Sequence, residues 1–305
     1  MHLPDFHDRS LTGADGVVLR ASVAGEGPAV VLLHGFPQTR LMWRHVAPAL
    51  ARRHTVICPD LRGYGDSDKP SADDPDTYSK RTMARDVVAI TEALGFDRFA
   101  VVGHDRGALV ALRTALDHPD RVTHLATLDV LPTADMWDVL HGVHAAVAWH
   151  LYLMAQPPGL PERMIEAVAE DFFAAFLDGW GADERAIPAD VRRAYLDASA
   201  RAVPSIVADY RASATVDLEH DEADRRSGRR LEMPVTVVQQ DWGAQLGYDA
   251  AGLWRAWATD LDHRTLDVGH FMAEQAPDAV LEVVEQLLAR RAVPAAPDDD
   301  AVHDS

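Results

Sequence analysis

The sequence predicts an α/β protein with a mostly parallel sheet of eight strands, flanked by helices and interrupted by a helical insertion. Two observations lead to this class. Continuous apolar runs of strand length, typical of buried parallel strands, alternate with segments whose apolar residues recur at helical spacing. From about residue 131 to 225 the strand patterns stop, and amphipathic helical runs follow one another until strand patterns return. We therefore expect a core in two parts, residues 1–130 and 226–291, with a helical cap at 131–225 between them.

The first part of the core carries the clearest patterns. Two short β-like runs around Gly13 and Gly16, within residues 6–24, predict an antiparallel hairpin at the sheet edge. Further strands are expected at 29–33, 53–58, 99–102 and 121–128. Helices are expected at about 40–51, 79–94 and 108–118. The loop at 59–67 is rich in Gly and Asp and is predicted to be an ordered part of the scaffold.

Pro and Gly clusters divide the rest of the chain. The insertion is predicted to break at 157–159, at 179–181 and at Pro188. In the second part of the core we expect strands at 234–239 and 263–268, and helices at 250–258 and about 278–291. The basic run at 225–230 is predicted to be a solvated surface, and the proline-containing, acidic tail at 292–305 to be disordered.

Composition and charge exclude several classes of partner. The chain has 305 residues, of which 48% are apolar, enough for a full hydrophobic core. A net charge of −19 argues against nucleic acid and anionic membranes, and leaves a small molecule as the expected partner. The same charge provides no long-range attraction for an anionic substrate. A substrate carboxylate would have to be bound by local positive groups.

Cysteine usage and the N-terminal sequence bear on cofactors and compartment. Cys58 is the single cysteine and lies in a strand-like run, so we expect no internal disulfide and no thiolate metal cluster. No cofactor and no metal are expected either. The first residues lack a basic segment followed by an apolar one, and no apolar run approaches about 18 residues. We expect a cytoplasmic protein without a signal peptide or membrane span. A homodimer is suggested only by analogy.

The strongest functional signal surrounds Asp105. The apolar run 99–102 leads into Gly103-His104-Asp105-Arg106-Gly107, and a helical segment follows. Gly-x-Asp-x-Gly between a strand and a helix is the pattern of a nucleophile elbow, a sharp turn that lifts one side chain above the sheet. The two glycines are expected because such a turn leaves no room for a Cβ atom on either side. An aspartate that only caps the helix is the alternative interpretation.

A carboxylate at the tip of this turn narrows the chemistry. An aspartate is ordinarily ionised at neutral pH, so no base is needed to activate it. It can attack a saturated carbon and form an ester with the enzyme, which a water and a general base must then hydrolyse. Carbon–halogen bonds and epoxides are the natural targets of such a reaction.

Other polar residues follow predicted strands. His34-Gly35-Phe36 comes after the strand at 29–33, and a loop of this kind supplies a backbone N–H to an oxyanion hole, here that of Phe36. Asp129 comes just after the strand at 121–128, at the edge of a doubly wound sheet where ligand-binding residues gather. Gly269-His270 follows the last predicted strand.

Taken together, residues 5–291 resemble the α/β-hydrolase fold. Several sequence blocks closely resemble the haloacetate and fluoroacetate dehalogenases: 34–38, 60–70, 103–107, Trp149-His150, 209–212 and 217–221. The first three blocks are shared in part with epoxide hydrolases, whereas the blocks from the cap discriminate better between the two families.

The resemblance implies a catalytic triad. Asp105 would displace the halide and become esterified, His270 would activate the hydrolytic water, and Asp129 would orient His270. Asp241 is a rival for the acid, because many members of the fold place it after the strand at 234–239; the dehalogenase match favours Asp129.

The resemblance also implies how the substrate is bound. Phe36 and Arg106 would provide the backbone N–H groups of an oxyanion hole, and the Arg106 guanidinium would bind the substrate carboxylate as a planar fork. From the cap, His150 and Tyr210 would donate hydrogen bonds to the departing halide, with Trp149 beside them.

Two positions depart from the family pattern. Leu109 replaces a second arginine four residues after the nucleophile, and Leu151 replaces a tryptophan after the cap histidine. A lost guanidinium contact is worth about 1.5–3 kcal/mol, and a lost indole removes one hydrogen-bond donor to the halide. Because fluoride is a poor leaving group, we predict weak or no fluoroacetate activity and a preference for chlorinated, brominated or less polar substrates.

Two other functions remain open at this point. An epoxide hydrolase would use the same three residues, with Tyr210 protonating the opening oxygen; His150 argues against it and the apolar Leu109 and Leu151 argue for it. A ligand-binding protein without activity is the second alternative. A serine esterase is disfavoured, since the chain contains no Gly-x-Ser-x-Gly.

Overall fold

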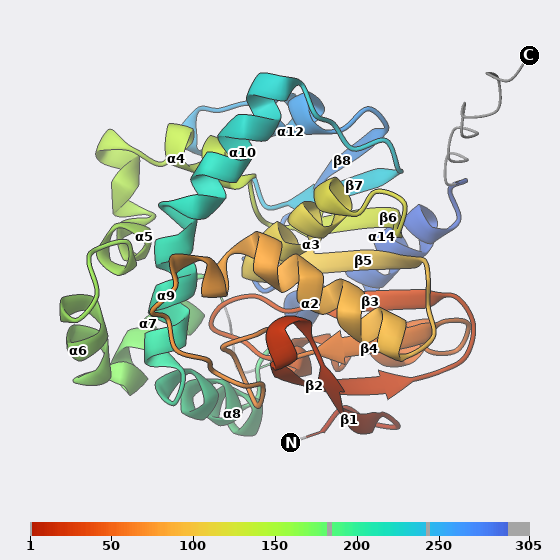
Figure 1. Ribbon diagram of the computed structural model, residues 1–305, viewed down its shortest axis with the longest axis horizontal. Helices are drawn as coiled ribbons and strands as arrows, with labels where there is room; N and C mark the ends of the chain where they lie inside the picture. Colours follow the sequence, from red (N-terminus) through yellow and green to blue (C-terminus); the bar gives the residue numbers. More distant parts are fainter. Residues whose placement is uncertain (1, 182–184, 242–244, 292–305) are drawn as a thin grey trace, which may run out of the picture.

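A sheet of eight strands lies at the centre of the computed structural model, which describes residues 2–181, 185–241 and 245–291 (Figure 1). Its strands are β1 (His7–Thr12), β2 (Val18–Ala24), β3 (Ala29–Leu33), β4 (Thr55–Pro59), β5 (Phe99–His104), β6 (Val122–Leu128), β7 (Val235–Gln239) and β8 (Leu261–Thr265). They are ordered β1-β2-β4-β3-β5-β6-β7-β8. β2 is antiparallel to β1 and to β4, and all other neighbours are parallel. The predicted edge hairpin and mostly parallel sheet are confirmed.

Helices cover both faces of this sheet, and others form the insertion between β6 and β7. They are α1 (Ala47–Leu50), α2 (Lys80–Ala93), α3 (Arg106–Asp117), α4 (Thr133–Val139), α5 (Trp149–Met154), α6 (Leu160–Glu166), α7 (Ala169–Gly179), α8 (Ala189–Ala200), α9 (Val203–Ser213), α10 (Val216–Ser227), α12 (Ala250–Trp257), α13 (Met272–Gln275) and α14 (Pro277–Leu288). In Figure 1, α2 and α3 lie in front of the sheet and α14 behind it. All residues of β3 and β5 are consequently buried, as the continuous apolar runs at 29–33 and 99–102 predict.

Two segments differ from the expectation. The helix predicted at 40–51 is a 3-10 turn (Arg40–Trp43) followed by the short α1, because Pro48 lacks the N–H that a continuous helix would need there. The last strand begins at Leu261 and ends at Thr265, instead of running from 263 to 268. β8 is the edge strand and only half-buried, so its sequence lacks the continuous apolar pattern of the central strands.

The helices α4 to α10 come between β6 and β7, and we call them the cap. In Figure 1, α5 to α9 lie together to the left of the sheet. Breaks between cap helices coincide with the predicted positions: 157–159 separates α5 from α6, α7 ends at Gly179, and α8 follows Pro188. The acidic tail at 292–305 lies outside the described residues.

Buried ion pairs join the cap to the core. Arg113 of α3 lies 2.6 Å from Asp221 and 2.5 Å from Asp224, both on α10. The basic run at 225–230, expected to be solvated surface, is partly exposed but also forms ion pairs: Arg225 with Asp135 and Asp138, and Arg229 with Asp117 and Asp224. The cap is thus held by cations and carboxylates on both sides of its boundary with the core.

Two further observations concern Cys58 and membranes. Cys58 lies within β4 with no exposed surface, and burial raises the pKa of its thiol, so it is an inert core residue. None of the helices in the described part of the chain combines the length and apolar character needed to cross a bilayer.

Candidate active site

Asp105 occupies a sharp turn between β5 and α3. Its φ of 48° and ψ of −117° lie in a region that L-residues with a side chain rarely adopt. A Cβ atom on Gly103 would lie 2.3 Å from the carbonyl oxygen of Gly107, and one on Gly107 would lie 2.3 Å from that of His34. The turn therefore needs both glycines and aims the carboxylate of Asp105 away from the end of the sheet.

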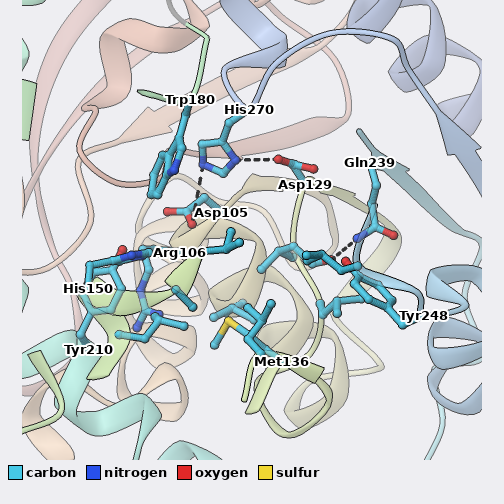
Figure 2. A pocket seen from close by; sticks show the side chains of 18 residues that line it. Asp105, Arg106, Asp129, Met136, His150, Trp180, Tyr210, Gln239, Tyr248 and His270 are labelled. Atoms are coloured by element: carbon cyan, nitrogen blue, oxygen red, sulfur yellow. Dashed lines mark hydrogen bonds and ion pairs between the residues drawn. The ribbon is translucent and has the colours of Figure 1, made fainter. Parts of the chain in front are cut away.

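Two groups contact this carboxylate. The backbone N–H of Phe36 donates to its Oδ1 atom at 2.7 Å, from the loop that follows β3. The Nε2 atom of His270 lies 3.9 Å from its Oδ2 atom. The loop that carries Phe36 packs closely against Asp105. A Cβ atom on Gly35 would lie only 2.5 Å from the Cβ of Asp105, so this position requires glycine. Figure 2 shows His270 directly above Asp105.

The acid behind His270 is Asp129. His270 Nδ1 lies 2.6 Å from Asp129 Oδ2, and Asp129 is itself in a positive-φ conformation (52°) just after β6. Burial raises the pKa of Asp129, but hydrogen bonds from His270 and Gln240 lower it by more. Burial lowers the pKa of His270, and Asp129 and Asp105 together raise it above its ordinary value. The rival, Asp241, is exposed at the surface.

His270 is also held through its backbone. His104 Nε2 lies 2.8 Å from the His270 carbonyl oxygen, and burial lowers the pKa of His104 to about 4, so its ring is neutral and donates this bond. The backbone N–H of His270 donates to the carbonyl of Trp180, at the end of α7 in the cap, at 3.1 Å. The Trp180 and His270 rings pack edge to face with centroids 4.7 Å apart. The position of His270 thus depends on both core and cap.

Asp105, Asp129 and His270 line a cavity of about 120 Å³ between the core and the cap. This volume far exceeds the space that a single water needs. Figure 2 shows His150, Tyr210 and Arg106 at one end of the cavity and Gln239 and Tyr248 at the other. Apolar side chains form most of the remaining wall: Leu109, Val130, Leu131, Met136, Leu140, Val147, Ala148, Leu151 and Leu246.

Two cap side chains bring hydrogen-bonding groups into the cavity near Asp105. The Nδ1 atom of His150 and the hydroxyl of Tyr210 are buried and find no hydrogen-bond partner among the described residues. Burial lowers the pKa of His150 to about 3, so its ring is neutral and can donate only one N–H. Burial raises the pKa of Tyr210 well above its ordinary value, which keeps the hydroxyl protonated. Both can donate to an anion formed beside Asp105.

The guanidinium of Arg106 is not free to bind a substrate carboxylate with two parallel hydrogen bonds, as the resemblance implies. Its Nε and Nη2 atoms donate to the Asp209 carboxylate at 2.8 and 2.9 Å, and Nη2 also donates to Ser213 at 2.7 Å. Lys80 forms a further ion pair with Asp209. Burial raises the pKa of Asp209, but Arg106 and Lys80 lower it by more. Within the described chain, only Nη1 of Arg106 remains for a ligand.

The three other predicted binding residues separate into two groups. Leu109 and Leu151 line the cavity, as expected of the positions that depart from the family pattern. Trp149 does not: it is 46% exposed, stacks on Phe176 and is absent from the cavity wall. Placing it beside the halide was wrong, because consecutive helical residues point about 100° apart, and α5 turns His150 inward and Trp149 outward.

Three residues that hold His270 and Asp129 in place escaped the sequence analysis. They are His104 and Trp180, which anchor His270, and Gln240, which donates to Asp129. Gln240 directly follows β7, at the strand end where the fold places polar residues, and this position was the available signal. No group of three or more metal-ligating side chains occurs in the described ranges.

Comparisons with known proteins show the family of the chain. The model of the alpha/beta hydrolase fold family matches residues 28–277. A fluoroacetate dehalogenase from Burkholderia sp is 38% identical over 290 residues, 92% of this chain and 94% of that protein. A soluble epoxide hydrolase from Corynebacterium sp. (strain C12) is 48% identical over 118 residues, 39% of this chain and 40% of that protein. The crystal structure of ALR0039 from Nostoc sp PCC 7120 is similar with a TM-score of 0.90 and 38% identity, covering 94% of this chain and 99% of that one.

Proposed function

The chain belongs to the α/β-hydrolase fold family and is a hydrolase, and from this premise we propose that it cleaves carbon–halogen bonds of small haloacids through an ester on Asp105. The observation that carries the proposal is the carboxylate at the tip of the elbow, where a serine hydrolase would have a hydroxyl. It lies 3.9 Å from His270, with Asp129 behind the histidine.

In the first step, Asp105 attacks the carbon that bears the halogen. A carbon–oxygen bond forms as the carbon–halogen bond breaks, and the halide leaves with the bonding electron pair. His150 and Tyr210 donate hydrogen bonds to the halide as its charge develops. The product of this step is an ester between Asp105 and the hydroxyacid carbon.

In the second step, His270 removes a proton from water through Nε2, and the water attacks the carbonyl carbon of the ester. The N–H groups of Phe36 and Arg106 stabilise the oxyanion that forms. Asp129 stabilises the protonated histidine, which returns its proton to the departing alkoxide. The hydroxyacid is released and the Asp105 carboxylate is restored.

Epoxide hydrolysis is the second candidate. The same three residues serve it, and the apolar wall of the cavity favours a substrate without charge. Among the described residues near Asp105, Tyr210 offers the hydroxyl that can protonate the opening oxygen, because the neutral ring of His150 is a poor acid and Tyr248 lies at the other end of the cavity. Dehalogenation needs donors to an anion but no proton transfer to it, so it is the better match.

Mass spectrometry of the intact variant His270→Gln provides the test. After addition of bromoacetate, the variant should gain the mass of the acid minus HBr, on the peptide that contains Asp105. Double substitution with Asp105→Asn is the matched control and should gain none. A protein that only binds its ligand would show no adduct in either variant, and this result would overturn the proposal.

A screen of wild-type protein then separates the two chemistries. Halide release from bromoacetate and chloroacetate, without diol formation from styrene oxide, is the expected result. Diol formation without halide release would instead establish the epoxide hydrolase.

A further inference from the structure

We infer that the site acts on haloacids whose reacting carbon carries an alkyl chain, and that this chain occupies an apolar chamber within the cavity. The inference rests on the proposed function, because Asp105 fixes where the reacting carbon lies. The chamber is formed by five side chains: Leu109, Leu131, Met136, Leu140 and Leu151.

The chamber is built by both parts of the molecule. Leu109 comes from α3, Leu131 from the segment after β6, Met136 from α4, Leu140 from the end of α4 and Leu151 from α5. None of these side chains can donate a hydrogen bond, and the Met136 thioether is only a weak acceptor. In Figure 2, Met136 lies away from the end that His150 and Tyr210 occupy. We expect a group that turns from the reacting carbon toward Met136 to meet apolar side chains.

The polar groups of the cavity fix the orientation of the other substituents. Arg106, His150 and Tyr210 lie close together, with the Arg106 guanidinium carbon 4.2 Å from the centre of the Tyr210 ring. Leu109 follows Arg106 by three residues on α3, so the two lie on the same helix face. A carboxylate near Arg106 and a halogen near His150 leave the third substituent pointing past Leu109 into the chamber.

Charge leads to the same substrate class. The Arg106 guanidinium is already paired with Asp209, and Leu109 supplies no second cation. A two-carbon haloacid has only its carboxylate and halogen to hold it, and most of the available positive charge is neutralised. Burial of an alkyl chain supplies the missing binding, at about a fourfold gain for each methylene removed from water.

A homologous series of acids tests this inference at constant chemistry. In 2-bromopropanoate, 2-bromobutanoate, 2-bromopentanoate and 2-bromohexanoate the reacting carbon is the same and only the chain grows. We expect kcat/KM for bromide release to rise by about fourfold per methylene. A flat or falling series, with bromide released throughout, would overturn the inference and leave the proposed function intact. If no acid releases bromide, bromoacetate included, the proposed function itself is wrong.

A pair of variants tests where the alkyl chain of the substrate binds. Leu140→Trp should fill the chamber and lower the ratio of kcat/KM for 2-bromohexanoate over 2-bromopropanoate at least tenfold. Val143→Trp is the matched control, because Val143 is 86% exposed and does not line the cavity. Its ratio should equal that of the wild type. If both variants keep the same ratio of kcat/KM for the two acids, with unchanged melting temperatures, the alkyl chain of the substrate binds elsewhere.

Discussion

Gln240 donates two hydrogen bonds to Asp129, one from its side-chain amide at 2.7 Å and one from its backbone N–H at 3.1 Å. The amide bond reaches the same Oδ2 atom that faces His270. Both bonds lower the pKa of Asp129 and fix the plane of its carboxylate. We therefore infer that Gln240 positions Asp129, the acid that we propose to orient His270.

Replacing this amide tests that role. In Gln240→Leu the backbone bond remains and the side-chain bond is lost, which costs about 1.5 kcal/mol at a charged acceptor. We expect kcat to fall about tenfold with little change in KM, and the pKa of His270 to change, as measured by NMR. Gln286→Leu, on the exposed face of α14, is the control. An unchanged His270 titration would contradict the assignment.

The pH dependence should differ between the two chemical steps. In the free enzyme, the charges of Asp129 and Asp105 raise the pKa of His270. Esterification removes the charge of Asp105, so the pKa of His270 should fall in the intermediate. Because the neutral ring is the base, ester hydrolysis should gain rate as pH rises through this lower pKa. The pH dependence of single-turnover ester hydrolysis gives the pKa of His270 in the intermediate, and NMR titration gives its pKa in the free enzyme. Identical pKa values in the two states would contradict the prediction.

Consecutive residues of α5 provide a matched pair for the leaving-group site. His150 is 7% exposed and lines the cavity, whereas Trp149 is 46% exposed and does not. His150→Ala removes one donor to the halide and should lower kcat/KM for chloroacetate by at least tenfold. Trp149→Ala should leave it within twofold. If both variants lose activity to the same extent, the effect lies in the packing of α5 and not in the donor.

Fluoride should be a poor leaving group for this enzyme. The described cavity offers it His150 and Tyr210, with the indole of Trp180 also in the wall, and Leu151 adds no donor. The Arg106 charge that would bind the acid is shared with Asp209. We expect chloride release from chloroacetate to exceed fluoride release from fluoroacetate at least a hundredfold, measured with ion-selective electrodes. Comparable rates of fluoride and chloride release would mean that the hydrogen-bond donors in the cavity suffice to stabilise a departing fluoride.

The ion pairs between cap and core should matter for stability according to their burial. Arg113→Met leaves the Asp221 carboxylate buried without its cation and leaves Asp224 with Arg229 alone, at a cost of about 3–5 kcal/mol in the free energy of unfolding. Arg193→Met breaks an exposed pair with Glu170 and should cost less than about 1 kcal/mol. Urea titration measures both. Equal losses would show that the buried pairs do not secure the cap.

The sequence predicted the centre of the fold better than its edge, for a physical reason. β3 and β5 are buried on both faces, so residues 29–33 and 99–102 are apolar without interruption and could be recognised as strands. β8 has a neighbouring strand on one side only. Because it contains polar residues, the sequence pattern does not mark where the strand begins and ends. The helix predicted at 40–51 failed because Pro48 interrupts the backbone pattern, although the apolar spacing continues.

The same distinction holds in the candidate site. Asp105 could be located because its turn imposes glycines at fixed positions nearby in the sequence. The partner of Arg106 could not, because Asp209 lies 103 residues away and only the docking of α9 brings them together. Neighbouring Trp149 and His150 could not be assigned to opposite faces, since a short helix contains too few residues to define its buried side.

The bond between the His270 N–H and the Trp180 carbonyl links access to reactivity. A displacement of α7 would lengthen this bond and shift the imidazole that we propose as the general base. The seating of the cap on the core therefore bears on the alignment of His270 with Asp105 as well as on the walls of the cavity.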